Sequence, residues 1–279
     1  MTGPTAERIQ DGDGRQYHIG LKSGEAAPRI ILVGDPERAD RVAERFDKTT
    51  LTRRCREYVT HTGELGGRDV TVMATGIGCD NMEIAVVELL ACVTDPVIIR
   101  VGSCGALQPD IAVGDAVIST SAVRLESTSL GFVEEGYPAH AHHEAILALV
   151  SAAADLGVSH HVGVTAAAAG FYGLQGRSGN AIEPRFPDMP ERLAKQGVLN
   201  LEMETSTLFT LATLARVRAG AVCAVFANRP ANAFIAADDK HSAEDRAISV
   251  GLRALEYLDA MDAKGRPFVL DAPQGADSG

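Results

Sequence analysis

The sequence predicts a single-domain α/β fold with three layers, α/β/α, and a mixed central β-sheet. Short runs rich in β-branched residues recur along the chain, and longer segments with helical spacing of apolar residues separate several of them. One glycine-rich stretch between two such runs indicates a hairpin, and therefore an antiparallel pair within the sheet. With 279 residues, 46% of them hydrophobic, the chain is long enough to fill the core of one domain.

Six apolar runs predict most of the strands. In chain order they are residues 29–33, 70–75, 97–101, 116–120, 161–165 and 221–227. Their β-branched side chains favour the buried surface of a sheet. Residues 63–69, GELGGRD, are predicted to form the hairpin turn that joins residues 58–61 to residues 70–74, so the sheet contains antiparallel as well as parallel strands.

Five segments with apolar residues at helical spacing predict helices. They are residues 36–46, 81–92, 143–155, 202–217 and 242–261. Pro36 suits the first turn of its helix, where no backbone N–H is needed. Residues 1–15 and 264–279 are rich in Gly, Asp, Pro and Ala, which predicts flexible tails on a domain of residues 16–263.

Composition and charge exclude several classes of function. The formal net charge of −11 argues against nucleic acid or an anionic membrane surface as a partner. The five cysteines are scattered without a Cys-x-x-Cys motif, which indicates a reducing compartment and no structural zinc. No stretch resembles a signal peptide or a membrane span. We therefore expect a cytoplasmic protein with no bound metal, and we assign no metal to His140, His142 and His143, which lack matching carboxylates.

Ligands of α/β sheets bind beyond the carboxyl ends of the strands, so the strand exits are the places to look for a site. At the first exit, Gly34 would let backbone N–H groups approach an anion, and Arg38 lies one helical turn further on. Taken alone, this motif more often represents an ordinary turn with a surface arginine. The second exit, residues 75–81, lacks the dinucleotide-binding fingerprint because Asn81 stands where a third glycine is needed. A nicotinamide-dependent oxidoreductase therefore ranks last.

The third exit contains a charged residue, Arg100, inside a run that should be buried. An unpaired buried arginine is unfavourable. A phosphate dianion would compensate it by bidentate contacts, with Ser103 as a further donor. An internal ion pair with a carboxylate would compensate it equally well, and the residues alone do not separate these two possibilities.

Two further segments carry side chains suited to a nucleoside. Phe171, Gln175 and Arg177 could hold a planar uracil by packing, by amide hydrogen bonds and by donation to a carbonyl oxygen, or they could form a surface loop. Glu204 could accept hydrogen bonds from ribose hydroxyls beside Met203, although acidic residues in a first helical turn usually complement the helix dipole. Residues 228–230 could form a turn or a wall of the base pocket.

Taken together and in this order, these segments resemble the nucleoside phosphorylase-I family, and within it the uridine phosphorylases. The likeness extends from about residue 17 to residue 261. It rests on Tyr17-His18-Ile19-Gly20-Leu21, Gly34-Asp35-Pro36-Glu37-Arg38, Cys55-Arg56-Glu57-Tyr58, Thr75-Gly76-Ile77-Gly78, Arg100-Val101-Gly102-Ser103-Cys104-Gly105, residues 171–177, Glu202-Met203-Glu204 and Asn228-Arg229.

The resemblance implies a site for inorganic phosphate and one for ribose. Phosphate would be held by Gly34, Arg38, Arg100 and Ser103, with Arg56 reaching in from a neighbouring subunit. The ribose-binding residues would be Met203, Glu204 and, from the same neighbour, His18. Sites shared in this way require at least a dimer, and the family leads us to expect a homo-oligomer built from dimers, with a hexamer favoured.

The resemblance also implies the base and the reaction. Uracil would contact Phe171, Gln175 and Arg177, and the Gln-x-Arg pair separates pyrimidine from purine enzymes of the family. Purine-specific members generally have aspartate where Asn228-Arg229 stands here. The implied reaction is reversible phosphorolysis of uridine to uracil and ribose 1-phosphate, and its catalytic residues would be Arg100, Arg177, Gln175 and Glu204.

No cofactor is implied, since phosphate is a co-substrate. Some members of the family bind potassium at the dimer interface through positions that match Glu57, Ile77 and Asn81. Asn81 replaces the usual serine, so the resemblance does not carry this ion over. Three other functions stay open: a purine nucleoside phosphorylase, a nucleosidase that uses water, and a nucleoside-binding protein without turnover.

Overall fold

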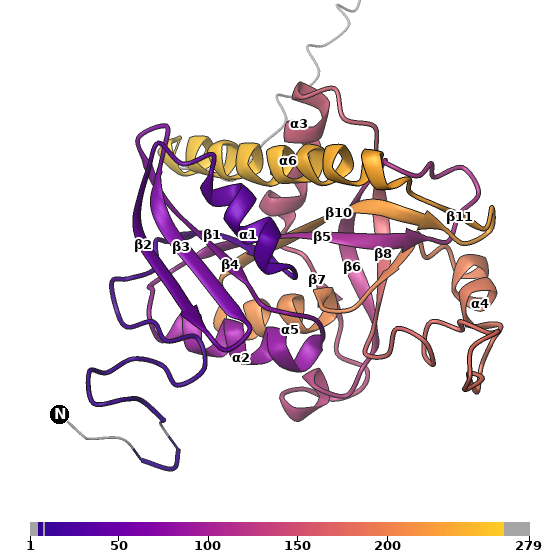
Figure 1. Ribbon diagram of the computed structural model, residues 1–279, viewed down its shortest axis with the longest axis horizontal. Coiled ribbons are helices and arrows are strands. Elements are labelled where there is room, and N and C mark those ends of the chain that lie inside the picture. Colours follow the sequence, from indigo (N-terminus) through magenta and orange to yellow (C-terminus); the bar gives the residue numbers. More distant parts are fainter. Residues whose placement is uncertain (1–4, 8, 265–279) are drawn as a thin grey trace, which may run out of the picture.

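The computed structural model describes residues 5–7 and 9–264, and in this part of the chain it forms one mixed sheet of 11 strands (Figure 1). The strands are β1 (Arg29–Val33), β2 (Lys48–Cys55), β3 (Tyr58–Leu65), β4 (Arg68–Ala74), β5 (Val97–Ala106), β6 (Ala116–Leu125), β7 (Ala139–His140), β8 (His160–Ala168), β9 (Asn200–Glu202), β10 (Arg218–Asn228) and β11 (Ala233–Phe234). The helices are α1 (Pro36–Ala43), α2 (Cys79–Leu90), α3 (His143–Asp155), α4 (Met189–Lys195), α5 (Thr205–Ala215) and α6 (Ala237–Ala263), with a 3-10 turn, η1 (Ser129–Gly131).

The α/β class and the mixed sheet predicted from the sequence are confirmed. All six predicted apolar runs lie in strands except for Thr75, which follows the end of β4, and several of these strands are longer than predicted because pairing continues past the apolar residues. The predicted hairpin is present with a tighter turn. Leu65 pairs with Arg68, and the two residues between them, Gly66 and Gly67, have φ angles of 58° and 75°. Two successive positive φ angles are the reason that this turn needs glycine.

The start of one predicted helix is wrong, and several elements, among them β2 and α4, were not predicted. The helix predicted over residues 202–217 begins only at Thr205, because residues 200–202 form the short strand β9 between β5 and β8. The strand β2, KTTLTRRC, was not predicted, because it is a polar edge strand with no apolar run. Exposed, charged residues are common on edge strands, where they discourage pairing with other chains.

Part of the sheet closes on itself. β10 pairs in parallel with β5 and antiparallel with β6, so that β10, β6, β8, β9 and β5 form a ring of paired strands. Cys104, Val117, Cys223 and Val225 belong to one buried cluster of these strands. β5 also pairs, through β1, with the open part of the sheet. β5 is therefore paired with β10 along its length, with β1 on its other side at residues 97–100 and with β9 at residues 105–106.

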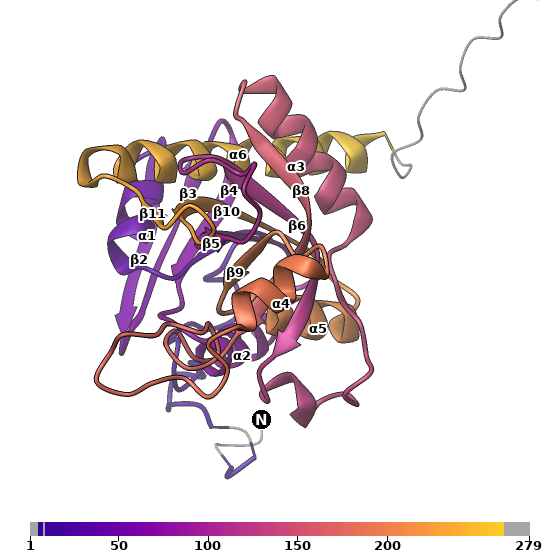
Figure 2. The same cartoon turned by 90° about the vertical axis from the view of Figure 1, so that its right-hand side faces the viewer.

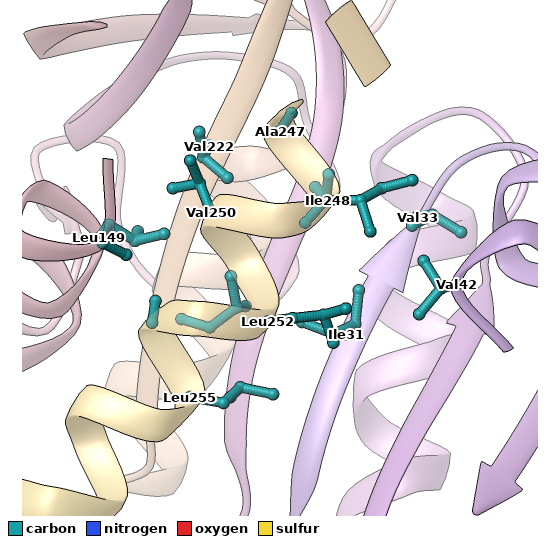
Figure 3. Packing of buried hydrophobic residues seen from close by; sticks show 14 of the residues in the cluster. Ile31, Val33, Val42, Leu149, Val222, Ala247, Ile248, Val250, Leu252 and Leu255 are labelled. Atoms are coloured by element: carbon teal, nitrogen blue, oxygen red, sulfur yellow. The ribbon is translucent and has the colours of Figure 1, made fainter. Parts of the chain in front are cut away.

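Helices lie on both faces of the sheet (Figures 1 and 2). On one face α1, α3 and α6 share a hydrophobic cluster with the strands, in which Ile248 and Leu252 lie close to Ile31 and Val33 (Figure 3). On the other face α2 and α5 pack through a second cluster that includes Phe209. Burying one such side chain contributes about 1.5–3 kcal/mol, so α6 is held firmly against the strands that carry the site.

The two ends of the chain differ in what can be described. The C-terminal residues 265–279, predicted to be a flexible tail, lie outside the described residues, as do residues 1–4 and 8 of the predicted N-terminal tail. Arg15, the last residue of that predicted tail, forms an ion pair with Glu25 at 2.5 Å. Among the helices of the described chain, none is both long enough and apolar enough to span a membrane.

Candidate active site

A cavity of about 770 Å³ opens where β1, β4, β5 and β10 approach their carboxyl ends. It brings together nine of the residues predicted from the sequence, which come from strands, helix starts and one long loop. These residues are Gly34, Arg38, Arg100, Ser103, Phe171, Gln175, Arg177, Met203 and Glu204. The wall is completed by Asp35, Pro36, Glu57, Gly76, Ile77, Asn81, Cys104, Gly105, Leu201, Glu202, Phe226, Ala227, Phe234 and Lys240.

The first strand exit leads directly from β1 into α1. The side chain of Asp35 caps the helix by accepting a hydrogen bond from the backbone N–H of Glu37 at 3.0 Å, and Pro36 occupies the first turn. A Cβ atom on Gly34 would lie 3.4 Å from the carbonyl oxygen of Gly76. This is an ordinary van der Waals distance, and the two exits are held together by a hydrogen bond from the backbone N–H of Gly76 to the carbonyl oxygen of Gly34 at 3.0 Å.

Arg38 is buried, with 5% of its surface exposed, so the interpretation of this motif as a turn with a surface arginine is wrong. Its Nη2 donates to Oε1 of Glu244 at 2.7 Å, and its Nη1 donates to the carbonyl oxygen of Val101 at 3.3 Å. Its Nε is also buried, and no described residue accepts a hydrogen bond from it. An unsatisfied buried donor is unfavourable unless a ligand completes it.

Arg100 lies within β5 rather than beyond its end, as the strand runs to Ala106. Its side chain is buried and forms ion pairs with Glu202, at 3.1 Å from Nε, and with Glu204, through Nη2. The internal ion pair that the sequence left open is therefore present. Burial by itself would lower the pKa of Arg100, but the two carboxylates raise it. Its Nη1 is buried and lacks a hydrogen-bond partner within the described chain.

Glu202 and Glu204 divide two tasks at the start of α5. Glu202 accepts hydrogen bonds from the backbone N–H groups of Glu204, at 2.9 Å, and of Thr205, at 3.0 Å. Glu204 holds the N-cap position of the helix, and its side chain makes no capping hydrogen bond. Glu204 accepts a hydrogen bond from the backbone N–H of Gly78 at 2.7 Å and lines the cavity. Burial and the neighbouring charge of Glu202 raise the pKa of Glu204, although Arg100 opposes this shift.

The segment between β8 and α4 carries the three residues predicted to contact a base (Figure 2). The guanidinium of Arg177 lies 3.9 Å from the centroid of the Phe171 ring, and its Nη2 donates to Oε1 of Gln175 at 3.3 Å. Arg229 donates through Nη1 to the carbonyl oxygen of Gln175 at 3.1 Å, so it supports this loop from the turn after β10. Burial, together with the charge of Arg229, lowers the pKa of Arg177.

Two of the predicted site residues lie outside the cavity of the described chain. Nδ1 of His18 is 2.6 Å from Oε1 of Glu88. Arg56 has a positive φ of 54°, and its guanidinium lies 4.9 Å from the centroid of the Tyr17 ring. Both residues were predicted to act in the active site of a neighbouring subunit, and this stays a prediction because the structure describes a single subunit.

The residues that match potassium ligands in the family lie together at the edge of the cavity. Nδ2 of Asn81 donates to the carbonyl oxygen of Ile77 at 3.3 Å, and a Cβ on Gly76 would lie 3.4 Å from Cγ of Glu57.

One residue of the histidine cluster has a structural role. His142 caps α3 by accepting a hydrogen bond from the backbone N–H of Glu144. In the described chain, no three His, Cys, Asp or Glu side chains are grouped in a way that could hold a metal ion.

The sequence did not reveal the carboxylates that balance the two buried arginines. Glu244 is 206 positions from Arg38, and no local pattern links residues so far apart. Glu202 was recognised only as part of a motif. Because residues 202–217 were predicted to be helical, nothing in the sequence placed Glu202 beside Arg100. A buried arginine does require a carboxylate or an anion, but the partner is identified only by the fold.

This chain is similar to known proteins over most of its length. A family model described as the phosphorylase superfamily matches residues 28–257. The uridine phosphorylase of Thermococcus kodakarensis is 46% identical over 241 residues, which cover 86% of this chain and 87% of that protein. The uridine phosphorylase of Escherichia coli K12 is 37% identical over 248 residues, covering 87% of this chain and 97% of that protein.

A relative named after another nucleoside is nearly as similar to this chain as the Escherichia coli protein is. The guanosine phosphorylase of Halorubrum lacusprofundi is 36% identical over 251 residues, which cover 88% of this chain and 99% of that protein. Its name and those of the uridine phosphorylases all describe nucleoside phosphorylases. The family resemblance predicted from the motifs is thereby confirmed, and the chain belongs to the phosphorylase superfamily.

Proposed function

We propose that this chain is a uridine phosphorylase, which splits uridine with inorganic phosphate into uracil and ribose 1-phosphate, reversibly and without a cofactor. One observation carries the proposal. Two buried guanidinium groups, those of Arg38 and Arg100, line one cavity, and each keeps a buried N–H group for which the described chain supplies no acceptor. A phosphate dianion is the ligand that satisfies two such donors at once.

The balance of charge supports a shared phosphate site. Arg38 is already paired with Glu244, and Arg100 is paired with both Glu202 and Glu204. These carboxylates offset the positive charge, so a dianion would need a further cation nearby. We assign this role to Arg56 of a second subunit, as the family resemblance implies, with Ser103 and the backbone at Gly34 as additional donors.

The nucleoside would occupy the remainder of the cavity. Glu204 has a carboxylate that faces the cavity and could accept hydrogen bonds from the ribose hydroxyls, while Met203 packs against the sugar. The base would lie against Phe171, with Gln175 and Arg177 at its polar edge. Gln175 is suited to this task because it is 3% exposed and is held by contacts with the adjacent arginine.

Cleavage of the N-glycosidic bond places positive charge on the sugar and negative charge on the departing base. Arg177 and Gln175 would stabilise the charge on the base oxygens, a role whose loss typically costs about 10²–10³ in rate. Phosphate held by Arg38 and Arg100 would stabilise the sugar cation and then attack C1′. Glu204 would orient the ribose for this attack. A uracil leaving group needs no protonation in this scheme.

A second candidate is a purine nucleoside phosphorylase, favoured by the similarity to a guanosine phosphorylase. The Gln175 and Arg177 pair beside the cavity favours a pyrimidine instead, and no aspartate stands at positions 228–229 to protonate a purine ring. A nucleosidase and a nucleoside-binding protein without turnover are two further candidates. The donors left unpaired in the cavity favour an enzyme that uses phosphate over both.

The proposal is tested by incubating the purified protein with uridine, thymidine and inosine, each with and without phosphate, and identifying the products by chromatography. Release of uracil together with ribose 1-phosphate, only when phosphate is present, is the expected result. Base release without phosphate would indicate a nucleosidase, and cleavage of inosine alone would overturn the role of Gln175 and Arg177. If no substrate is turned over, the remaining candidate is a nucleoside-binding protein.

The proposal extends to the form of the enzyme. We infer a single three-layer α/β/α domain over residues 16–263, in a homo-oligomer built from dimers that share their active sites, with a hexamer favoured. His18 of one subunit would reach the 5′-hydroxyl in the site of the next. The cytoplasm, where free nucleosides and phosphate are available, is the proposed location. An interface potassium ion is not part of the proposal.

A further inference from the structure

The helix α6 places a buried carboxylate behind the cavity. Glu244 is 4% exposed. Its Oε1 accepts a hydrogen bond from Arg38 at 2.7 Å, and its Oε2 accepts one from Nη1 of Arg41. Burial by itself would raise the pKa of Glu244, but the guanidinium groups of Arg38 and Arg41 outweigh burial and hold this pKa below its ordinary value. Glu244 is therefore a carboxylate shared by two arginines.

The contacts of Arg38 leave one nitrogen of its guanidinium without an acceptor. Nη2 is held by Glu244, and Nη1 donates to the carbonyl oxygen of Val101. These two nitrogens fix the plane of the group, because a guanidinium is a rigid planar fork. Nε is buried and unpaired within the described residues, and Arg38 lines the cavity. The Nε–H group thus lacks an acceptor within the described chain, and an anion bound beside Arg38 would supply one.

Glu244 is itself held in place by the core. Ala247 and Ile248, one turn further along α6, are buried in the same hydrophobic cluster as Val33 and Val42 (Figure 3). Val33 ends β1 and Val42 lies on α1, the two elements that flank the loop at the first strand exit. The carboxylate therefore has a defined position relative to that loop.

Arg38 and Arg41 depend on this carboxylate to lie close to one another. They are three positions apart on α1, where side chains at this spacing are neighbours. Without Glu244, two like charges would repel and Arg38 would hold a buried charge without a carboxylate. Arg38 would then leave the orientation that it has beside the cavity.

We propose that Glu244 is a positioning residue for phosphate, acting through Arg38, in the reaction proposed above, on which this inference rests. Glu244 does not line the cavity and contacts no substrate. It holds the guanidinium of Arg38, which does line the cavity, in one orientation. Its loss therefore changes the use of phosphate far more than the use of the nucleoside.

Asp245, the residue after Glu244, provides a matched control. Asp245 also belongs to α6 and accepts hydrogen bonds from Arg41, at 2.6 Å, and from Arg45, at 3.0 Å. It makes no ion pair with Arg38 among the contacts of the described chain. Asp245→Asn thus weakens the contact between α1 and α6 without disturbing the nitrogens of Arg38.

The experiment measures steady-state phosphorolysis of uridine with each substrate varied in turn. Glu244→Ala is expected to raise the KM for phosphate about tenfold or more, since small misplacements of a binding group have effects of this size. The KM for uridine should stay within about twofold of the wild type, as should both constants in Asp245→Asn. Glu244→Gln should have a smaller effect than Glu244→Ala, because its amide oxygen still accepts a hydrogen bond from Arg38.

A double variant decides whether Glu244 acts through Arg38. If it does, Arg38→Ala combined with Glu244→Ala should have a KM for phosphate within about twofold of Arg38→Ala alone, since coupled residues are not additive. This variant removes both buried charges, so it tests the inference even if Glu244→Ala alone does not fold. Multiplied losses in the double variant, or a KM for phosphate in Glu244→Ala no higher than in Asp245→Asn, would overturn the inference.

The wild-type protein separates this inference from the proposed function. Wild-type protein that releases no uracil with phosphate would refute the proposed function, and calorimetric binding of inorganic phosphate would then supply the same comparison among the variants. An active wild type with unaltered phosphate use in the Glu244 variants would refute the positioning role alone.

Discussion

Nε of Arg100 lies 3.1 Å from Oε2 of Glu202, and the two side chains are 4% and 1% exposed. The same carboxylate accepts hydrogen bonds from the backbone N–H groups of Glu204 and Thr205. The side chain of Glu202 thus forms an ion pair with Arg100, a predicted phosphate ligand, and also binds two backbone N–H groups at the start of α5. The stability of the fold and the geometry of the site depend here on a single residue.

Glu202→Ala should therefore destabilise the protein strongly. Arg100 keeps its ion pair with Glu204, but it loses the hydrogen bond from Nε to Glu202, and the backbone N–H groups of Glu204 and Thr205 lose an acceptor. Hydrogen bonds to a charged group contribute about 1.5–3 kcal/mol. We expect the free energy of unfolding to fall by about 3 kcal/mol, measured by urea denaturation with circular dichroism. Glu64→Ala, at an exposed position of β3, should change it by less than about 0.5 kcal/mol. A decrease in Glu202→Ala no larger than in this control would refute the double role.

Arg177→Ala tests the predicted stabilisation of the departing base. We expect kcat for uridine phosphorolysis to fall about 10²–10³-fold, since Arg177 would act on charge that develops in the transition state. Phosphate binding, measured by calorimetry, should be unchanged. Arg185→Ala is a suitable control, because Arg185 belongs to the same loop but lies over the Phe186 ring, 4.8 Å from its centroid. Unchanged turnover in Arg177→Ala would remove this residue from the mechanism.

Acid should weaken the fold through Glu244. Burial by itself would raise the pKa of this carboxyl, but Arg38 and Arg41 lower it in the folded chain. Its stabilisation is therefore complete above the unfolded-state pKa of about 4.3 and is lost as the pH falls through the lower folded-state value. We expect the free energy of unfolding to fall more steeply between about pH 5 and pH 3 in the wild type than in Glu244→Gln. Urea denaturation at closely spaced pH values measures both slopes, and equal slopes would contradict the assignment.

Shared active sites predict complementation between inactive variants. Arg56→Ala should damage the site of the neighbouring subunit, whereas Arg177→Ala should damage the subunit's own site. In a mixed dimer, one site would carry both changes and the other would carry none. Random mixing of the two variants should restore about a quarter of the wild-type activity, because half of the dimers are mixed and half of their sites are intact. Co-refolding followed by the uracil release assay measures this fraction.

The control for complementation uses two variants of the same site. Arg177→Ala mixed with Gln175→Ala should restore no activity, because every site then contains one of the two changes. Failure of the Arg56 and Arg177 mixture to exceed its parents, despite mixed dimers being present, would mean that Arg56 acts within its own subunit or not at all.

Local patterns in the sequence were sufficient for much of the fold. The predicted helix over residues 143–155 coincides with α3, since apolar residues at helical spacing specify such an element with little help from the rest of the chain. The strand β2 and the strand β9 could not be predicted in this way. β2 is polar, and β9 has three residues that form a strand only because β5 and β8 lie on either side.

The sequence by itself determined the α/β class, the order of the motifs and the family, because these depend on residue types and spacing along the chain. The tertiary structure alone decided that Arg38 is buried against Glu244, that Arg100 is paired with Glu202, and that Arg229 supports the loop of Gln175. The physical reason is that the partner of a buried charge is chosen by proximity in space. Residues 206 positions apart become neighbours only when the sheet has assembled.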